Sequence, residues 1–409
     1  MVSFAEVLGG AERSLLELAR RLPPRGWTPV LACPPGRLAD VAAADGIRVE
    51  VLPLRPVRAV SRVSRRRPGK SYSAAAVAAR AVTTARNAWQ LARLARELDA
   101  ALIHSNSLPS HLSAALAGAA TGRPVLWHLR EIIRPGAGRT FFSRAGRLVS
   151  GMVAISDSVA TTVSHRSVTT VYNPVDAPPT DVPPLDLPLP RPLVGYLGRL
   201  DAHKGIEDLI PAVGTTSAHL VVAGRRYAAG EEYVESLREL ARREAPGRVH
   251  FVGEVAAPWE LLAGVDVLVV PSLAEPWGRV AAEGQRAGVA VLAADAGGLP
   301  EIVTDGRDGL LFPPSDAEAL GRQLRRLLED EPLRSRLAST GRTTSTRFDP
   351  ERHADAMARL LEAHATPDVR QVRARGLAHR VVRRASYLPR RSVRLPSDEP
   401  SNSTCRAGS

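Results

Sequence analysis

The regular alternation of short apolar runs with helical segments is the feature that most constrains this fold. Residues 265–270 (VDVLVV) form an apolar run with the length of a buried parallel strand, and Pro271, which cannot donate to a strand ladder, ends it. Helical spacing begins at Arg279. The same succession occurs in both halves of the chain. It predicts an α/β protein built from doubly wound, largely parallel sheets.

A proline-rich segment divides the chain into two such regions. With 409 residues, the chain is long enough for two hydrophobic cores. We predict an N-terminal Rossmann-like domain over 1–176, an extended linker over 177–190 and a C-terminal Rossmann-like domain over 191–365. The two domains are expected to face each other across a cleft, and the last predicted helix belongs to the second interval. Residues 366–409 are expected to form a disordered tail.

The first domain opens with a glycine pair that leads into a helix. Gly9 and Gly10 precede a segment with leucines on one face, and a glycine loop at a helix start is a natural anion site. Only residues 2–4 are available for the strand that should precede this loop, so we expect a truncated first strand. The start has no basic leader region, and no apolar run reaches membrane-spanning length. Cys33 and Cys405 show no metal-ligand spacing, which favours a reducing, cytoplasmic location.

The net charge of +13 is concentrated in two segments. Residues 55–70 carry six Arg and one Lys without an acid, and residues 366–409 carry ten Arg against three acids, so that the remainder is nearly neutral. Such clusters attract anionic lipid, nucleic acid or an acidic partner, or are simply solvated. Aromatic residues make up 4% of the chain, and Tyr387 is the one aromatic residue in the tail, which disfavours nucleic acid as a partner. We expect a peripheral position on the inner face of an anionic membrane.

Two cations and two glutamates are the candidates for chemistry. Arg199 follows the first strand of the second domain, and Lys204 precedes the next helix, an arrangement that suits a diphosphate. Glu275 lies in the loop after residues 265–270, and Glu283 lies about one turn into the following helix. Because ligands of open α/β sheets bind at the carboxyl ends of the strands, all four side chains are expected at one edge.

Several motifs together resemble the retaining nucleotide-sugar glycosyltransferases of glycosyltransferase family 4, which have the GT-B fold. The strongest are GRLDAHKG at 198–205, EPWGRVAAE at 275–283 with its E-x7-E spacing, and GGLPEIV at 297–303. Weaker matches follow the family's order up to about residue 365: GGAE (9–12), HSNS (104–107), His128, VAISDSV (153–159) and YNPVD (172–176).

The resemblance implies a role for each matching residue. Arg199 and Lys204 would hold the diphosphate of the donor, and Glu283 would accept hydrogen bonds from the ribose. Glu275 and His128 would contact the donor sugar. The backbone amides of three consecutive residues would lie nearby; these residues are Trp277, Gly278 and Arg279. The loop at Gly9 and Gly10 would line the acceptor and phosphate side, and Gly297 and Gly298 would let the backbone approach the donor.

The resemblance further implies transfer of a sugar from a nucleoside diphosphate donor to a glycan or lipid-linked acceptor, with retention of configuration and without a metal or other cofactor. Cell-envelope polysaccharide synthesis would be the setting. Alternative hypotheses are a degenerate GT-B protein that binds through its basic segments, a nucleotide-sugar epimerase and a phosphorylase. A glycosidase using Glu275 and Glu283 as an acid/base pair is a further alternative, although hydrolysis has no use for Arg199 and Lys204.

Overall fold

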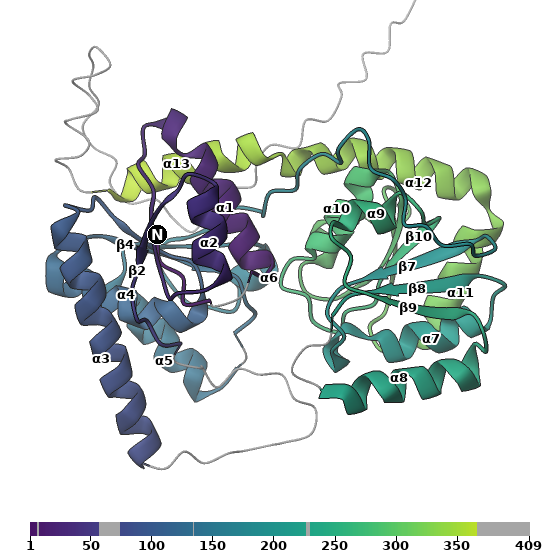
Figure 1. Ribbon diagram of the computed structural model, residues 1–409, viewed down its shortest axis with the longest axis horizontal. Helices are drawn as coiled ribbons and strands as arrows, with labels where there is room; N and C mark the ends of the chain where they lie inside the picture. Colours follow the sequence, from purple (N-terminus) through teal and green to yellow (C-terminus); the bar gives the residue numbers. More distant parts are fainter. Residues whose placement is uncertain (6–7, 57–73, 134, 226–229, 366–409) are drawn as a thin grey trace, which may run out of the picture.

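The protein has two α/β domains that lie side by side (Figure 1). The computed structural model describes residues 1–365 except 6–7, 57–73, 134 and 226–229. The first domain contains, in chain order, α1 (Gly10–Arg21), η1 (Pro23–Arg25), β1 (Val30–Cys33), α2 (Arg37–Ala44), β2 (Arg48–Val51), α3 (Ala74–Glu97), β3 (Ile103–Ser105), α4 (Leu108–Thr121), β4 (Val125–Leu129), α5 (Ala137–Ala145), η2 (Gly146–Leu148), β5 (Gly151–Ala154), α6 (Asp157–Ala160) and β6 (Val168–Thr170).

The sheet of the first domain is parallel and is joined in its middle by the first residues of the chain. β1 pairs with β2, and β3, β4, β5 and β6 pair in that order. Val2 bridges both groups, because it pairs with Ala32 of β1 and with Ser105 of β3. The predicted first strand is therefore short, with its pairing confined to one residue on each side, and Val2 and Phe4 are buried in the core.

The second domain has a six-stranded parallel sheet in the order β12-β11-β10-β7-β8-β9. Strands β10 and β11 are buried along their whole length, as expected of a sheet that is covered by helices on both faces. Its elements are β7 (Leu193–Leu197), η3 (Ala202–Lys204), α7 (Ile206–Gly214), β8 (His219–Ala223), α8 (Gly230–Glu244), β9 (Val249–Gly253), α9 (Pro258–Leu262), β10 (Val267–Val270), α10 (Arg279–Ala287), β11 (Ala290–Ala294), η4 (Leu299–Glu301), β12 (Leu310–Phe312), α11 (Ala317–Glu329), α12 (Glu331–Thr344) and η5 (Ser345–Phe348).

The last helix, α13 (Pro350–His364), corrects the predicted domain boundary. The sequence interval 191–365 assigns it to the second domain, but Figure 1 shows that it returns to the first, where it lies beside α1. Its apolar face, formed by Ala354, Met357 and Leu361, packs into one buried cluster with Leu18 of α1, with Leu22 just after that helix, and with residues of β4 and β5. The chain therefore passes between the domains twice, through residues 177–190 and through η5.

Both basic segments singled out from the sequence lie largely outside the described residues, since residues 57–70 and 366–409 are not among them. Within the part that the structure describes, no helix combines the length and the apolar character needed to span a membrane.

Candidate functional site

Lys204 and Glu275 form a buried ion pair between two loops at the carboxyl edge of the second sheet. Lys204 ends η3, one residue before Gly205 caps α7, and Glu275 lies between β10 and α10. The Lys204 Nζ donates to Glu275 Oε2 over 2.5 Å, and both side chains are less than one fifth exposed. Burial alone would raise the pKa of Glu275, but Lys204, Ser272 and Arg199 together outweigh it and hold that pKa below its ordinary value. Glu275 is thus ionised at neutral pH.

Arg199 completes this group of charges. It follows β7, and its carbonyl accepts a 2.8 Å hydrogen bond from the buried hydroxyl of Tyr196. Its guanidinium is close enough to Glu275 to help lower the pKa of that carboxyl group. The structure therefore brings together three of the predicted site residues: two cations and the carboxylate that partly neutralises them. A cation group with a net charge of about +1 at a helix N-terminus is suited to an anionic ligand.

Glycines fix the two loops that carry these charges. Gly205 has a φ of 69°, and a Cβ there would lie 2.0 Å from the carbonyl oxygen of Pro271. Gly297 has a φ of 60°, and its Cβ would lie 2.0 Å from the carbonyl oxygen of Glu275, to which the Gly298 amide donates over 2.8 Å. Gly297 and Gly298 therefore make room for the backbone of residues 275–277, and their approach to the donor stays a prediction.

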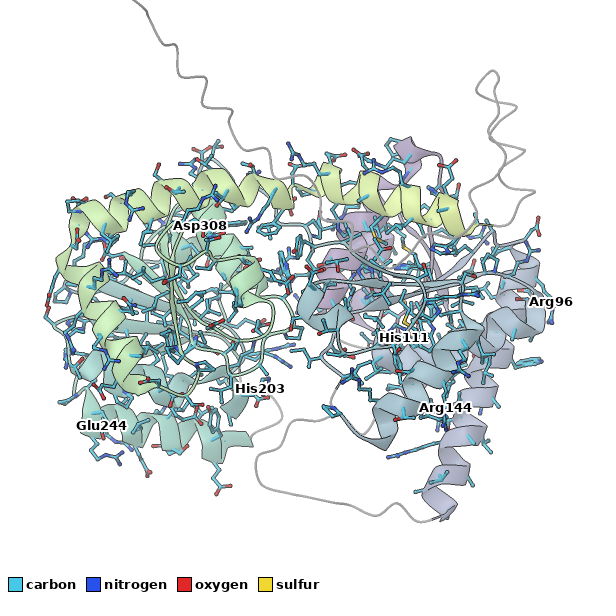
Figure 2. The ribbon with its side chains drawn as sticks, turned by 180° about the vertical axis from the view of Figure 1, so that it is seen from behind. Arg96, His111, Arg144, His203, Glu244 and Asp308 are labelled. Atoms are coloured by element: carbon cyan, nitrogen blue, oxygen red, sulfur yellow. The ribbon has the colours of Figure 1, made fainter. Side chains whose placement is uncertain are left out.

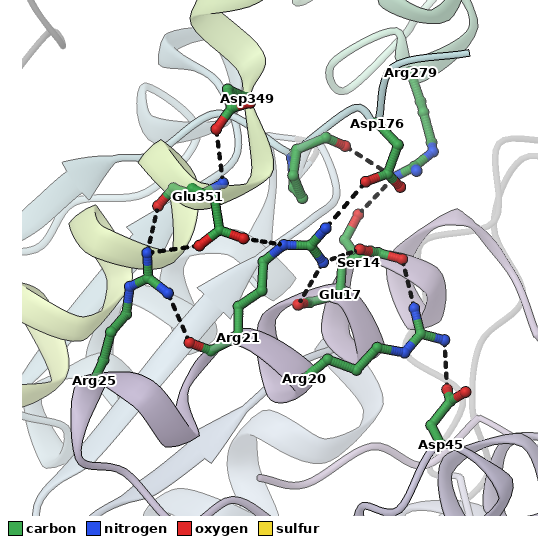
Figure 3. Close-up of polar contacts among 11 residues, drawn as sticks. Ser14, Glu17, Arg20, Arg21, Arg25, Asp45, Asp176, Arg279, Asp349 and Glu351 are labelled. Carbon is green, nitrogen blue, oxygen red and sulfur yellow. Dashed lines mark hydrogen bonds and ion pairs between the residues drawn. The ribbon is translucent and has the colours of Figure 1, made fainter. Parts of the chain in front are cut away.

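Arg279 and Glu283 form a second ion pair, which lies at the contact between the domains. Arg279 Nε donates to Glu283 Oε1 over 2.9 Å. Arg279 Nη1 donates to the carbonyl of Pro174 over 3.2 Å and to Ser14 Oγ of α1 over 3.0 Å, and Figure 3 shows Arg279 and Ser14. A Cβ on Gly10 would lie 3.9 Å from the Arg279 side chain. The predicted glycine loop of the first domain therefore does meet the predicted glutamate helix of the second, with Arg279 as the link.

The remaining residues of the 277–279 turn have different surroundings. The Trp277 side chain is 1% exposed and packs edge-on against Phe348, with ring centroids 5.2 Å apart. Only its backbone can therefore take part in binding. Gly278 caps α10 with a φ of 109°, and a Cβ there would lie 2.5 Å from Leu299. The turn is thus a rigid start to α10, whose first amides face the same edge as Glu275.

His128 lies in a buried group of polar side chains at the carboxyl ends of β3 and β4. Its Nδ1 is 3.2 Å from His104 Nε2 and 3.4 Å from Arg130 Nη2. A guanidinium only donates, so Nδ1 of His128 accepts and its Nε2 carries the proton. That Nε2 has no hydrogen-bond partner within the part of the chain that the structure describes. Burial, followed by the charge of Arg130, lowers the pKa of His128 well below its ordinary value, so the ring is neutral.

Arg130 also belongs to this site, although no sequence motif predicted a role for it. Its Nε donates to Asn106 Oδ1 over 2.8 Å and its Nη1 donates to Asn173 Oδ1 over 2.7 Å, so it joins the ends of β3, β4 and β6. Burial lowers its pKa to about 10, and the guanidinium remains protonated at neutral pH. The signal was present in the sequence, because a charged residue two positions beyond a buried strand histidine is placed at the ligand edge of a sheet.

A second interdomain contact was also missed. The Glu301 carboxylate accepts hydrogen bonds from the backbone amides of Asp157 and Ser158 over 2.7 and 2.8 Å. Beside it, Ser156 Oγ donates to the carbonyl of Pro276 over 2.5 Å. Ser156 of the first domain therefore also contacts the loop that carries Glu275, one residue away from the ion pair between Glu275 and Lys204.

The two halves of the chain each match a known protein-family model. Residues 8–177 match the family model "Glycosyltransferase Family 4", and residues 179–344 match "Glycosyl transferases group 1". HepE from Anabaena, solved with UDP and glucose, has a similar fold, with a TM-score of 0.73, 22% identity and coverage of 88% of this chain and 98% of that chain. The fold is therefore GT-B, and the two family models that the halves of the chain match are both glycosyltransferase models.

Curated relatives that match part of this chain are also glycosyltransferases by name. The lipopolysaccharide core biosynthesis glycosyltransferase LpsE of Rhizobium meliloti is 34% identical over 177 residues, which are 42% of this chain and 51% of LpsE. A D-inositol 3-phosphate glycosyltransferase of Corynebacterium jeikeium is 33% identical over 192 residues, 43% of this chain and 44% of that protein. The chain thus spans about half the length of the curated relatives it matches.

Proposed function

We propose that this protein is a glycosyltransferase that uses a nucleoside diphosphate sugar as donor. The observation that carries the proposal is the group formed by Arg199, Lys204 and Glu275 at the N-terminus of α7. Departure of a diphosphate builds negative charge, and two fixed cations beside a helix N-terminus stabilise it. The two family models support the same class, and HepE was solved with UDP.

In the proposed mechanism the sugar is transferred with retention of configuration. Glu275, ionised and fixed by Lys204, accepts hydrogen bonds from sugar hydroxyls, and the free Nε2–H of His128 donates to the sugar from the first domain. Glu283 binds the ribose, and the amides of residues 277–279 lie along the diphosphate. The leaving phosphate takes the proton of the acceptor. Arg199 and Lys204 supply the positive charge that a metal ion would otherwise bring.

The proposed acceptor is a glycan or a lipid-linked sugar, bound from the side of Gly9 and Gly10. LpsE, which acts in lipopolysaccharide core synthesis by its name, supports a role in the cell envelope. The basic segments 55–70 and 366–409 would bring the protein to the inner face of an anionic membrane, where lipid-linked acceptors are found. The donor itself reaches the site from the cytoplasm.

A donor screen tests the proposal. Incubation with UDP-, GDP- and ADP-sugars should release one nucleoside diphosphate faster than the others, and the anomeric signals of the product in proton NMR would show retention. We expect Lys204→Ala to reduce the turnover number by about a thousandfold, because it removes a charge that acts in the transition state. Arg243→Ala, an exposed position of the same domain, serves as the control. Near-normal turnover of a folded Lys204→Ala protein would refute the assignment.

A further inference from the structure

Exposed large apolar side chains are concentrated in one layer of the first domain. Seven such side chains occur among the described residues, and six of them lie on α3, α4, α5 and η2. The six are Val77 (55% exposed), Val82 (69%), Trp89 (63%), Leu116 (37%), Phe141 (60%) and Leu148 (51%). The seventh, Val51, ends β2. Scattered exposed apolar residues are normal on any protein, but this distribution is not scattered.

The topology explains why these elements share one face. The chain moves across the first sheet in one direction from β2 to β3, β4 and β5, and right-handed crossovers then place α3, α4 and α5 on the same side. Figure 1 shows these helices together, with α3 at the edge of the molecule farthest from the second domain. We call this set of four elements, α3, α4, α5 and η2, the outer helix layer.

Helix α3 has an apolar stripe on its solvent side. Ala78, Val82, Ala85 and Trp89 follow one another at spacings of four, three and four residues, and all are exposed. Toward its C-terminal end the helix is buried through Ala88, Leu91, Ala92 and Ala95. The helix therefore has enough buried surface to be held in the fold, and its outer stripe contributes nothing to the domain's own core.

The charge of the outer helix layer is almost entirely positive. Its four elements contain seven arginines and one acid, Glu97, which pairs with Arg93. Figure 2 shows Arg96 on α3 and Arg144 on α5 within this layer, away from His203 and the site edge of the second domain. The arginines are Arg80, Arg86, Arg93, Arg96, Arg139, Arg144 and Arg147. Protein surfaces that lie in a lipid interface typically combine Trp and Phe side chains with basic residues such as arginine.

We propose that the outer helix layer is a docking surface for an anionic lipid bilayer. Trp89 and Phe141 would enter the headgroup region, and the arginines would lie over anionic headgroups. A second copy of this chain is disfavoured as the occupant, because a two-fold contact would set seven arginines against seven. The inference goes beyond the proposed transfer reaction, since binding needs neither donor nor acceptor.

Vesicle sedimentation with the full chain tests the inference. We expect binding to vesicles of equal parts phosphatidylglycerol and phosphatidylcholine, little binding to phosphatidylcholine alone, and loss of binding at high salt. Trp89→Ser/Phe141→Ser should weaken binding about tenfold or more, whereas Val51→Ser should not. Arg86→Gln/Arg93→Gln/Arg144→Gln should weaken it about a hundredfold. The matched control, Arg242→Gln/Arg243→Gln/Arg322→Gln, removes the same charge from the second domain and leaves the outer helix layer unchanged.

A depth measurement separates insertion from simple charge attraction. Brominated lipids should quench tryptophan fluorescence of the wild-type protein, and Trp89→Phe should lose most of that quenching while it still binds. Binding that is equal on neutral and anionic vesicles, or that is unchanged in both sets of variants, would overturn the inference. So would a dimer in analytical ultracentrifugation that Trp89→Ser abolishes, because a second copy would then be the occupant. These readouts are independent of whether sugar transfer is detected.

Discussion

Lysine is rare in this chain, which has two, Lys70 and Lys204, among its 55 basic residues. Arginine serves at nearly every other basic position, and we infer that Lys204 needs its ammonium group rather than a guanidinium. The ammonium is compact and fits the 2.5 Å contact with Glu275, whereas the planar fork of arginine needs more room. We expect Lys204→Arg to keep the fold but to lose about a hundredfold in turnover. Full activity of this variant would show that charge alone is required.

Arg130 sets the tautomer of His128 in our interpretation, and this can be measured directly. In the wild-type protein, 15N NMR of labelled histidine should show His128 with an unprotonated Nδ1 and a protonated Nε2. Arg130→Met, which keeps an unbranched apolar stem and removes the donors, should yield a mixture of tautomers and a lower kcat with little change in KM for the donor. An unchanged tautomer in that variant would contradict the positioning role.

Four buried histidines predict a loss of stability in mild acid. Burial lowers the pKa of His104 and His128 well below the ordinary value, and lowers the pKa of His111 and His353 to about 3. In the unfolded chain they take up protons below about pH 6.5, and the folded protein does not, so stability falls as the pH falls. Each should contribute about 1 kcal/mol to the difference between pH 7 and 5.5. Urea unfolding at the two pH values measures it, and His111→Gln should show a smaller difference.

Individual residues were predictable from the sequence to different degrees. Motif spacing identified Lys204 and Glu275 as site candidates, but their ion pair depends on how two loops approach in space, which no local pattern encodes. Local rules also leave one helix cap ambiguous. Ser315 and Glu318 have the spacing of a capping box, yet Ser315 adopts a φ of 63° and Asp316 caps α11, accepting from the Ala319 amide over 2.8 Å. Neighbouring residues of similar capping propensity cannot be separated without the backbone conformation.

At the scale of elements, the glycine loops offer a matched pair of substitutions. Gly297→Ala would place a Cβ 2.0 Å from the Glu275 carbonyl at a positive φ, so the Glu275 loop must move. We expect a loss of about 2–4 kcal/mol in the free energy of unfolding, together with loss of donor binding. Gly306→Ala has a similar φ of 71° but open space around the new Cβ, and should cost about 1 kcal/mol without affecting the donor. If both substitutions lowered the free energy of unfolding equally, the positive φ alone would account for the loss, and the clash with the Glu275 carbonyl would not contribute.

The order and type of the elements followed from the sequence, because buried parallel strands and amphipathic helices each have a recognisable period. The partner of the last helix did not follow. The apolar face of α13 has the correct period for any core, and only the tertiary structure shows that Leu18 and Leu22 complete it. For the same reason, the contact of Glu301 with the amides of Asp157 and Ser158 lay beyond prediction. Contacts between distant segments depend on shape rather than on local spacing.

At the scale of the whole molecule, α13 follows the second domain in sequence but packs on the first domain. Arg21 and Arg25, on the α1 side, bind Glu351 through their guanidinium groups, and Arg21 also binds Asp176 just before the linker (Figure 3). A fragment containing residues 1–176 would expose the apolar surface that α13 covers. We expect this fragment to aggregate when it is produced alone and to become soluble when it is co-produced with residues 177–409. A soluble, cooperatively unfolding fragment 1–176 would disprove this dependence.

The return of α13 also determines how such proteins can be recombined. Consider a chimera that joins the first half of this chain to the second half of a relative, with the junction in residues 177–190. In that chimera the relative's last helix would replace α13. That helix would have to pack against Leu18, Leu22, Leu126 and Val153 of this chain, although its own apolar face packs against different side chains in the relative. The first domain is therefore discontinuous in sequence: residues 191–348 can be exchanged as one block, while residues 350–364 stay with the first domain.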